Sequence, residues 1–149
     1  MGFSDAVRTC LQEKYATFSG RASRSEYWYF MLFYFVVALV LTGLFLLLGG
    51  TETIETGEIS PLAWLPIGLL AVFGLGMIVP MISAAVRRFH DRNLSGWWYL
   101  GVILGGMIPV VGIVASIAGF VITVLKGTPG PNNFGRDPLG ADTSADVFT

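Results

Sequence analysis

The stretch RRFHDRNLSGWW, Arg87–Trp98, lies between two long apolar segments and marks where one membrane segment is expected to end and the next to begin. It holds three of the nine basic residues, the single histidine and two of the four tryptophans. Only 13% of the 149 residues are charged, about half the share in a soluble domain, and 54% are hydrophobic. Long uncharged apolar runs account for this composition, which indicates a small all-α integral membrane protein with one membrane domain, residues 25–126.

The segment before the first apolar run, residues 1–24, is predicted to be a cytoplasmic amphipathic helix and loop. Apolar side chains recur at helical spacing from Phe3 to Phe18, and polar side chains occupy the other side. A helix of this kind that precedes a membrane span is expected to lie in the headgroup plane, with its aromatic rings at the acyl boundary. The alternative is an ordinary helix that packs on the rest of the protein.

The first membrane span is predicted at about residues 27–48. Ser23 and Glu26 have the spacing of a capping box, in which each side chain satisfies a free backbone amide at the start of a helix. The following 22 residues contain no ionisable group other than tyrosine hydroxyls and would measure about 33 Å as a helix, enough to cross the hydrocarbon core. Trp28 lies at the start of this span, where an aromatic ring is expected to anchor at the interface.

The second span is predicted at about residues 62–86, after a short loop at 49–60 that carries three glutamates and no base. Pro80 lies inside this span. Because proline has no backbone N–H, it should kink the helix and free a carbonyl one turn earlier, which a neighbouring helix must satisfy.

The distribution of bases predicts the orientation of these spans. Four bases precede the first span, none lies in the loop between the spans, and three follow the second span. By the positive-inside rule, the N-terminus and Arg87–Trp98 are expected on the cytoplasmic side of a bacterial inner membrane. Trp97 and Trp98 are then interfacial anchors at the start of the next apolar segment.

Residues 97–125 allow two arrangements. They are long for one span and too short for two full spans of about 20 residues each. Pro109, beside several glycines, is a natural break, so we expect a short helix at 97–107 and a return helix at 109–125. This hairpin would leave the C-terminus cytoplasmic, whereas a single long kinked helix would place it outside.

The remaining residues form two parts. The stretch GTPGPNNFGRDP, residues 127–138, is rich in turn residues and lacks the lysine and following serine or threonine of a phosphate-binding loop. It is predicted to be a cytoplasmic turn-rich motif, ordered only where Phe134 docks. Residues 139–149 are small, polar and acidic, and are expected to be disordered.

Three of these stretches together resemble one protein family. They are FSGRASRSEYW at residues 18–28, RRFHDRNLSGWW at 87–98 and GTPGPNNFGRDP at 127–138. In this order they are similar to the bacterial membrane proteins known as domain of unknown function 805, over about Lys14–Pro138. The resemblance implies a small inner-membrane protein with several helices, and it supplies no established reaction, substrate or catalytic residue.

Four positions depart from the pattern of that family. This chain has Leu94 and Asn133 where members usually have a base, and it has Arg92 and Arg136 where they usually have a small residue or a proline. The departures remove two bases and add two nearby, so an anion site that depended on the family's own bases would differ here.

The hairpin arrangement would bring all three motifs to the cytoplasmic face, where their polar residues form a candidate site. Arginines at the headgroup level suit bidentate contact with phosphate, and the cytoplasmic leaflet is anionic. One interpretation is a site for an anionic lipid headgroup or a phosphorylated ligand. The other is that the bases only set topology and form local pairs, such as Arg87 or Arg24 with Asp91. The candidate residues are Arg21, Arg24, Glu26, Arg87, Arg88, His90 and Asp91.

The sequence favours a non-enzymatic protein that binds lipid headgroups or a partner protein through this face. His90 and Asp91 suggest general-base chemistry, but adjacent residues on a helix point about 100° apart and no nucleophile motif accompanies them. The spans hold few polar groups for an ion path, so a transporter or its accessory subunit would need an oligomer. One cysteine and one histidine cannot build a metal cluster, and no cofactor or nucleic-acid partner is predicted. Membrane lipids, a second copy or another membrane protein are the expected partners.

Overall fold

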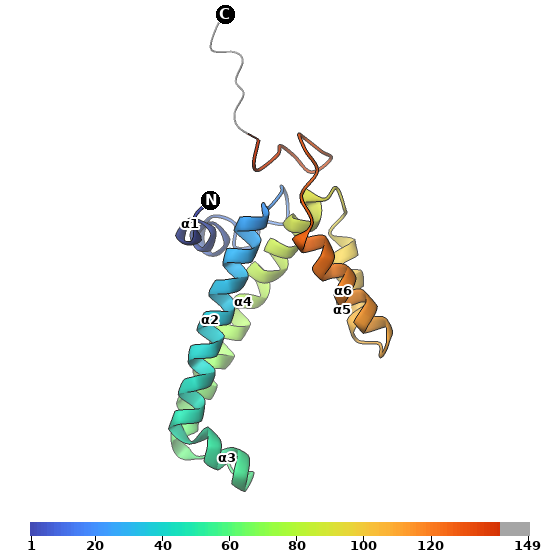
Figure 1. Cartoon of the computed structure of the whole chain (residues 1–149). Helices are drawn as coiled ribbons and strands as arrows, with labels where there is room; N and C mark the ends of the chain where they lie inside the picture. The colour runs from blue at the N-terminus through green and yellow to red at the C-terminus, as the bar shows by residue number, and fades with distance from the viewer. Residues whose placement is uncertain (141–149) are drawn as a thin grey trace, which may run out of the picture.

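The computed structural model describes residues 1–140, and this part of the chain is all-helical (Figure 1). Helices α2, Arg24–Phe45, and α4, Trp64–Asp91, pack side by side as a long pair. Helices α5, Trp97–Gly106, and α6, Val111–Val124, form a shorter hairpin. The two pairs meet at one end of the molecule and diverge toward the other, so the described chain has two arms (Figure 1). Both α2 and α4 are long and apolar enough to cross a membrane.

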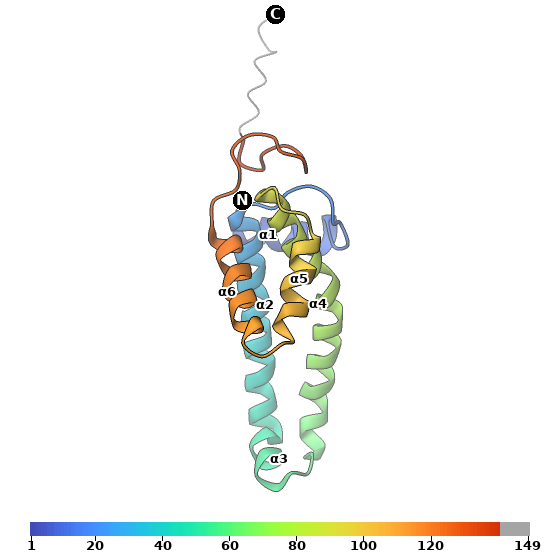
Figure 2. The ribbon, with the colours of Figure 1, turned by 90° about the vertical axis from the view of Figure 1, so that its right-hand side faces the viewer.

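The N-terminal helix is shorter than the predicted Phe3–Phe18. Helix α1, Phe3–Arg8, continues into a turn of π-helix, η1, Thr9–Glu13, and turns follow. The segment lies across the start of α2 (Figure 2). Ala6 and Cys10 are fully buried there, whereas Phe3 and Phe18 are about half exposed. The helix therefore packs on the protein with one face and keeps aromatic side chains on its surface.

Helix α2 starts where the sequence predicts and ends earlier. Ser23 is its N-cap, with its hydroxyl accepting the Glu26 N–H at 3.2 Å. After Phe45 the chain passes through η2, Leu46–Gly50, where Gly49 has a φ of 105°. The predicted loop at 49–60 was wrong in part, because it contains a short helix, α3, Thr51–Thr56; a 3₁₀ turn, η3, Pro61–Ala63, follows it before α4.

Helix α4 contains Pro80, and the carbonyl four residues earlier has the expected outside partner. The Tyr15 hydroxyl donates to the Gly76 carbonyl at 2.6 Å. The N-terminal segment is held to α4 a second time by Ser83, whose hydroxyl contacts the Lys14 and Thr17 carbonyls at 3.1 and 2.7 Å. The freed carbonyl therefore has a partner from outside α4, but the prediction that a neighbouring helix supplies it was wrong, because Tyr15 lies in the turn after η1.

Helix α4 extends beyond the residues predicted to cross the membrane. The helix continues to Asp91, about one and a half turns past residue 86. Arg87, Arg88, His90 and Asp91 therefore lie on a helix and not in a loop, and each is more than 90% buried. The reason is that neighbouring segments satisfy these polar groups, as described below.

Of the two arrangements open for residues 97–125, the structure has the hairpin. The turn between α5 and α6 lies around Pro109, and its N–H groups at 107, 108, 111 and 112 all donate to nearby carbonyls. Pro109 has no N–H, so the turn exposes few unpaired donors. Small residues let the helices approach closely: a Cβ added to Gly119 would lie 2.9 Å from Val102. Val110 has a φ of 68°, a rare conformation for a β-branched residue.

The segment after α6 returns to the end where α2 begins and α4 ends (Figure 2). Residues 127–138 cross over the last turn of α4 and are attached there at several points, not at Phe134 alone. The predicted disordered tail, residues 139–149, lies outside the described residues except for its first two positions.

Candidate functional site

The three sequence motifs meet at one end of the molecule. The Ala22 N–H donates to the Arg87 carbonyl at 3.0 Å, which joins the first motif to the second. The Thr128 N–H donates to the Asp91 carbonyl at 2.8 Å, which joins the third to the second. Between them lies a buried group of charged side chains that we call the ionic cluster: Arg21, Glu26, Arg87, Arg88 and Asp91.

Asp91 is the centre of the ionic cluster. Its carboxylate accepts from Arg21, with both Nε and Nη2 at 2.9 Å, and from Arg88 one turn earlier on the same helix. All three side chains are at least 95% buried. Charges in such surroundings are tolerated only when they are paired and hydrogen-bonded. Each of the two guanidinium groups also donates to backbone carbonyls of other segments.

Arg88 fastens the end of α6 to the long pair. Its Nε donates to the Thr123 carbonyl at 2.9 Å, and its other nitrogens donate to the Leu125 carbonyl and, at 3.3 Å, to the Ala22 carbonyl. The last carbonyls of α6 have no N–H donor within that helix, so a donor from outside must satisfy them. One arginine therefore connects α2, α4 and α6.

Arg87 forms a separate pair with Glu26 between α4 and α2. Cys10 of η1 lies against both, with its Sγ 3.7 Å from an Arg87 nitrogen and 4.0 Å from Glu26. Burial, followed by the Glu26 charge, raises the pKa of Cys10 to about 11. The Nε of Arg87 is the one buried side-chain nitrogen or oxygen within residues 1–140 that has no partner.

The third motif is held by Arg21, His90 and Asn132. Arg21 donates to the Gly130 and Thr128 carbonyls, both at 2.6 Å. The His90 ring stacks on Phe134, with centroids 4.0 Å apart and an angle of 6° between the planes. Its Nδ1 lies 3.1 Å from the Gly20 carbonyl, and Asn132 donates to the His90 carbonyl at 2.9 Å.

These contacts correct three predicted pairs. Glu26 pairs with Arg87 and does not reach back to complete the capping box with Ser23. Asp91 pairs with Arg21 and Arg88, not with the predicted Arg87 or Arg24. The spacing of residues along a helix identified partners that were possible, but the tertiary packing of three segments decided which ones formed.

His90 and Asp91 do not form a catalytic pair in this arrangement. The histidine ring faces Phe134 and Gly20, while the Asp91 carboxylate is occupied by two guanidinium groups. In the described residues no group of three or more histidine, cysteine, aspartate or glutamate side chains is placed to hold a metal ion.

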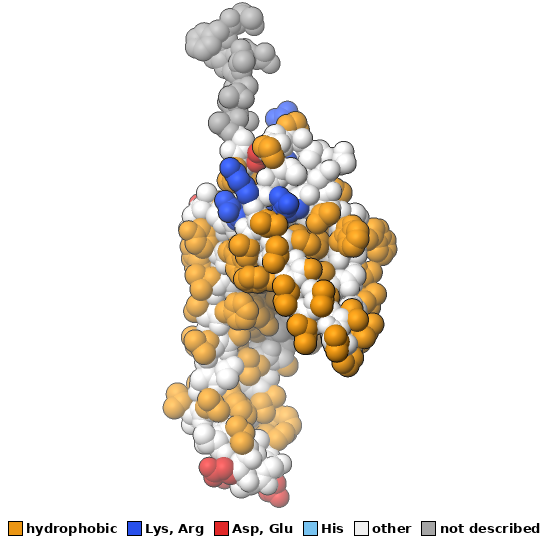
Figure 3. Space-filling model, turned by 45° about the vertical axis from the view of Figure 1, so that its right-hand side comes forward, with side chains coloured by type: hydrophobic (Ala, Val, Ile, Leu, Met, Phe, Trp, Pro, Cys, Tyr) orange, Lys and Arg blue, Asp and Glu red, His pale blue; other side chains and the backbone are white. Residues whose placement is uncertain are grey.

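A second set of bases lies outside the ionic cluster and is accessible. Arg24 and Lys126 are exposed and line a surface depression of about 300 Å³, together with Thr128 and the carboxylates Asp91 and Asp137. We call Arg24 and Lys126 the outer bases. Arg92 lies outside the depression and donates to the Lys126 carbonyl at 2.5 Å. Figure 3 shows basic side chains of this end gathered above the hydrophobic surface.

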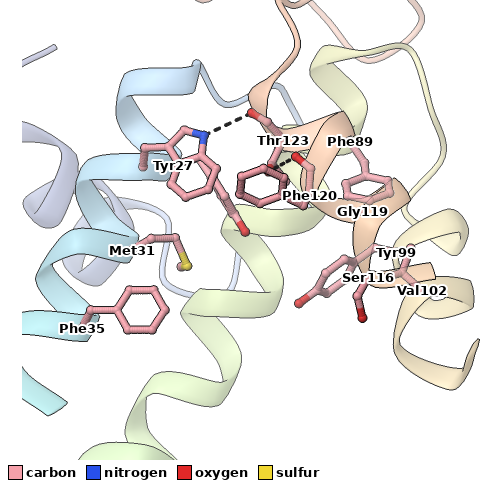
Figure 4. Close-up of a pocket in the computed structure, with 11 residues that line it drawn as sticks. Tyr27, Met31, Phe35, Phe89, Tyr99, Val102, Ser116, Gly119, Phe120 and Thr123 are labelled. Atoms are coloured by element: carbon pink, nitrogen blue, oxygen red, sulfur yellow. Dashed lines mark hydrogen bonds between the residues drawn. The ribbon is translucent and has the colours of Figure 1, made fainter. Parts of the chain in front are cut away.

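An apolar cleft of about 380 Å³ opens between α2 and the hairpin (Figure 4). The Trp28 indole N–H donates to the Thr123 carbonyl at 3.3 Å and its ring meets Phe120 edge to face at 5.7 Å, so Trp28 connects the two arms. Unlike Trp28, Trp97 and Trp98 are mostly exposed, at 77% and 64%. The lining residues are Tyr27, Trp28, Met31, Phe35, Phe89, Tyr99, Val102, Ser116, Gly119, Phe120 and Thr123.

The family model described as "Protein of unknown function (DUF805)" matches residues 15–136. This chain belongs to the DUF805 family. Two relatives from Escherichia coli K12 are similar to it over 126 residues: inner membrane protein YhaI, 34% identical, and inner membrane protein YhaH, 32% identical. Each match covers 85% of this chain, with 89% of YhaI and 90% of YhaH. No solved structure matches the chain.

In this DUF805 chain, the seven residues predicted as an anion site divide into two groups. Arg21, Glu26, Arg87, Arg88, His90 and Asp91 are buried and bonded to one another or to backbone, and Arg24 alone is exposed. The sequence reasoning missed Lys126. The available signal was its position as the first base after the last apolar run.

Proposed function

We propose that this DUF805 chain is a non-enzymatic inner-membrane protein that binds the headgroup of an anionic lipid at its cytoplasmic end. The outer bases Arg24 and Lys126 make the contact with phosphate. The ionic cluster has a different role, because its guanidinium groups are already bonded inside the protein: it fixes the ends of α2, α4 and α6 so that the outer bases lie side by side.

The proposed orientation rests on the separation of charge along the long pair. All nine bases of the sequence lie in the N-terminal segment, at the start of α2, at the end of α4 or after α6, which is one end of the fold. The opposite end, at α3 and the turn after it, has Glu52, Glu55 and Glu58 and no base. Bases are retained on the cytoplasmic side of bacterial membranes, so the end with the three motifs is placed there.

In this orientation the hairpin enters the membrane from the cytoplasmic side and returns. Helix α6 has 14 residues and measures about 21 Å, less than the roughly 30 Å of a hydrocarbon core. The turn around Pro109 would then lie inside the bilayer. Four N–H groups of the turn, at 107, 108, 111 and 112, donate to nearby carbonyls, which reduces the cost of irregular backbone at that depth.

One observation carries the headgroup proposal: Arg24 and Lys126 come from segments about a hundred residues apart and yet line the same depression. Neither forms an ion pair within the described residues. Arginine and lysine at the membrane surface each contribute about 1 kcal/mol of attraction to an anionic leaflet. Two of them converging on one depression are expected to hold one phosphate more firmly than either base alone.

Native mass spectrometry of the purified protein tests this proposal. The wild type, equilibrated with mixed micelles of phosphatidylglycerol and phosphatidylcholine, is expected to retain one phosphatidylglycerol, and R24A/K126A is expected to lose at least tenfold of that binding. The matched control is R8A/K14A, which removes two bases from the same end and should retain the lipid. Equal retention by both double variants, or no preference of the wild type for the anionic lipid, would refute the proposal.

A further inference from the structure

The apolar cleft and the depression with Arg24 and Lys126 are lined by the same two parts of the chain, α2 and the end of the hairpin. On α2, Arg24 precedes Trp28 by four residues, and Met31 and Phe35 continue that face at spacings of three and four. On the hairpin side, Ser116, Gly119, Phe120 and Thr123 of α6 line the cleft, and Lys126 lies in the extended chain directly after the helix, which ends at Val124. The basic depression therefore lies at the cytoplasmic end of the apolar cleft.

The cleft has the dimensions and the chemistry of a lipid-chain site. It runs along α2 from Tyr27 to Phe35, about 12 Å at 1.5 Å per residue. Its volume of about 380 Å³ lies within the range of ligand pockets. Phe35 and Phe120 are 62% and 59% exposed, so the cleft is open to whatever surrounds the arms. Figure 4 shows Phe35 and Met31 on the α2 side and Phe120 and Tyr99 on the hairpin side.

We propose that this cleft holds one acyl chain of the same anionic lipid whose phosphate contacts Arg24 and Lys126. The inference rests on the proposed function and adds to it: the protein binds a whole phospholipid between its two arms, not only a charged membrane surface. Charge complementarity favours this occupant over a helix of a second copy. The two carboxylates that line the depression are bonded elsewhere, Asp91 to Arg21 and Arg88, and Asp137 to backbone N–H groups. An apolar helix in the cleft would bring no further negative charge to Arg24 and Lys126, whereas a phospholipid supplies the phosphate and the chain in one molecule.

The geometry also accounts for Trp28. Its indole N–H and the Thr123 carbonyl join the arms at the level where the polar depression passes into the apolar cleft. Tryptophan is favoured where one side of a ring is apolar and its N–H meets a polar group. The contact sets the distance between the arms at the position where the glycerol region of a bound lipid would lie.

Photo-crosslinking in the wild-type protein tests the cleft directly. The probe is phosphatidylglycerol with a photoactivatable acyl chain, and the protein is washed until one lipid remains. Phe120 and Ile117 of α6 are a matched pair, because both are 59% exposed and only Phe120 lines the cleft. At least fivefold more crosslinking to Phe120 than to Ile117 is expected, and equal crosslinking would overturn the cleft proposal.

A cleft-filling variant separates this proposal from the headgroup proposal. S116F places a ring in the cleft, and V114F places one on the lipid-facing surface of the same helix, where Val114 is 65% exposed. We expect S116F to retain at least fivefold less phosphatidylglycerol than V114F at equal thermal stability. If S116F retains phosphatidylglycerol as the wild type does and R24A/K126A loses it, the headgroup proposal stands and the cleft proposal is refuted. Crosslinking at Phe120 decides the question if S116F does not fold.

Discussion

The basic residues at the end of the molecule where the three motifs meet divide into an inner and an outer set that differ in what they contact. Arg21, Arg87 and Arg88 are at least 95% buried, and their partners are carboxylates and backbone carbonyls of other segments. Arg24 and Lys126 are exposed and line an open depression. The same chemical groups thus serve two purposes a few residues apart: inner bases hold segments together, and outer bases remain available to a ligand.

The largest effect is expected at Asp91, because two inner arginines depend on it. In D91A the buried guanidinium group of Arg88 loses its carboxylate partner, and that of Arg21 keeps only Asp137, at 4.0 Å. Breaking a buried ion pair from one side costs about 3–5 kcal/mol. We expect loss of the folded peak in detergent size-exclusion chromatography. E55A, which removes an exposed carboxylate at the other end, should elute as the wild type does.

Substitutions of Arg87 and Glu26 are expected to have non-additive effects on stability, unlike substitutions of the outer bases. R87M and E26L should each lower the thermal unfolding temperature strongly, because each leaves one charge buried without its partner. The double variant should be more stable than either single variant, since an apolar pair of similar size can replace a buried ion pair. A double-mutant cycle in detergent measures the coupling, and additive losses would show that the two side chains act independently.

A smaller effect is expected for the attachment of the third motif. F134A removes the ring that stacks on His90, an interaction of about 0.5–1.5 kcal/mol. The helices should stay folded while residues 127–138 become easier to cleave, which limited proteolysis with mass analysis measures. Cleavage unchanged from the wild type would show that Arg21 and Asn132 hold this segment without the stacking contact.

The smallest effect on stability is expected for the outer bases. R24A/K126A should unfold within a few degrees of the wild type, because surface charges contribute little to the folded state.

The reactivity of Cys10 gives an independent check of the fold. Since burial raises its pKa to about 11, the thiol should react slowly with maleimide at pH 8 in both proteins and quickly after unfolding. Fast reaction of Cys10 in folded R24A/K126A would show that Arg24 or Lys126 is needed to keep Cys10 buried.

The sequence predicted several features of the helices well, because those features depend on local chemistry. Ser23 as the cap of α2, Pro109 as the break in the third apolar segment, and the carbonyl freed by Pro80 all follow from the properties of single residues. The length of α4 was predicted less well. A run of charged residues normally ends a membrane helix, and only the tertiary partners of Arg87 and Arg88 allow this helix to continue to Asp91.

The candidate site was predicted in its location but not in its division into two sets. Sequence spacing showed that Arg21, Arg88 and Asp91 belong to motifs that would meet. It contained no information on burial, so it could not separate Arg88, which is fully buried, from Arg24, which is exposed. The role given to Lys126 depends on the hairpin, which alone brings the end of α6 beside the start of α2.

The central claim is that the three motifs meet on the cytoplasmic side of the membrane, and labelling of single cysteines tests it most directly. In a C10A background, L139C reports the segment after the third motif and E55C reports the opposite end; both positions are exposed. With a membrane-impermeant thiol reagent on intact cells, E55C should react, and L139C should react only after the inner membrane is permeabilised. Labelling of L139C in intact cells would place the third motif outside and contradict the account.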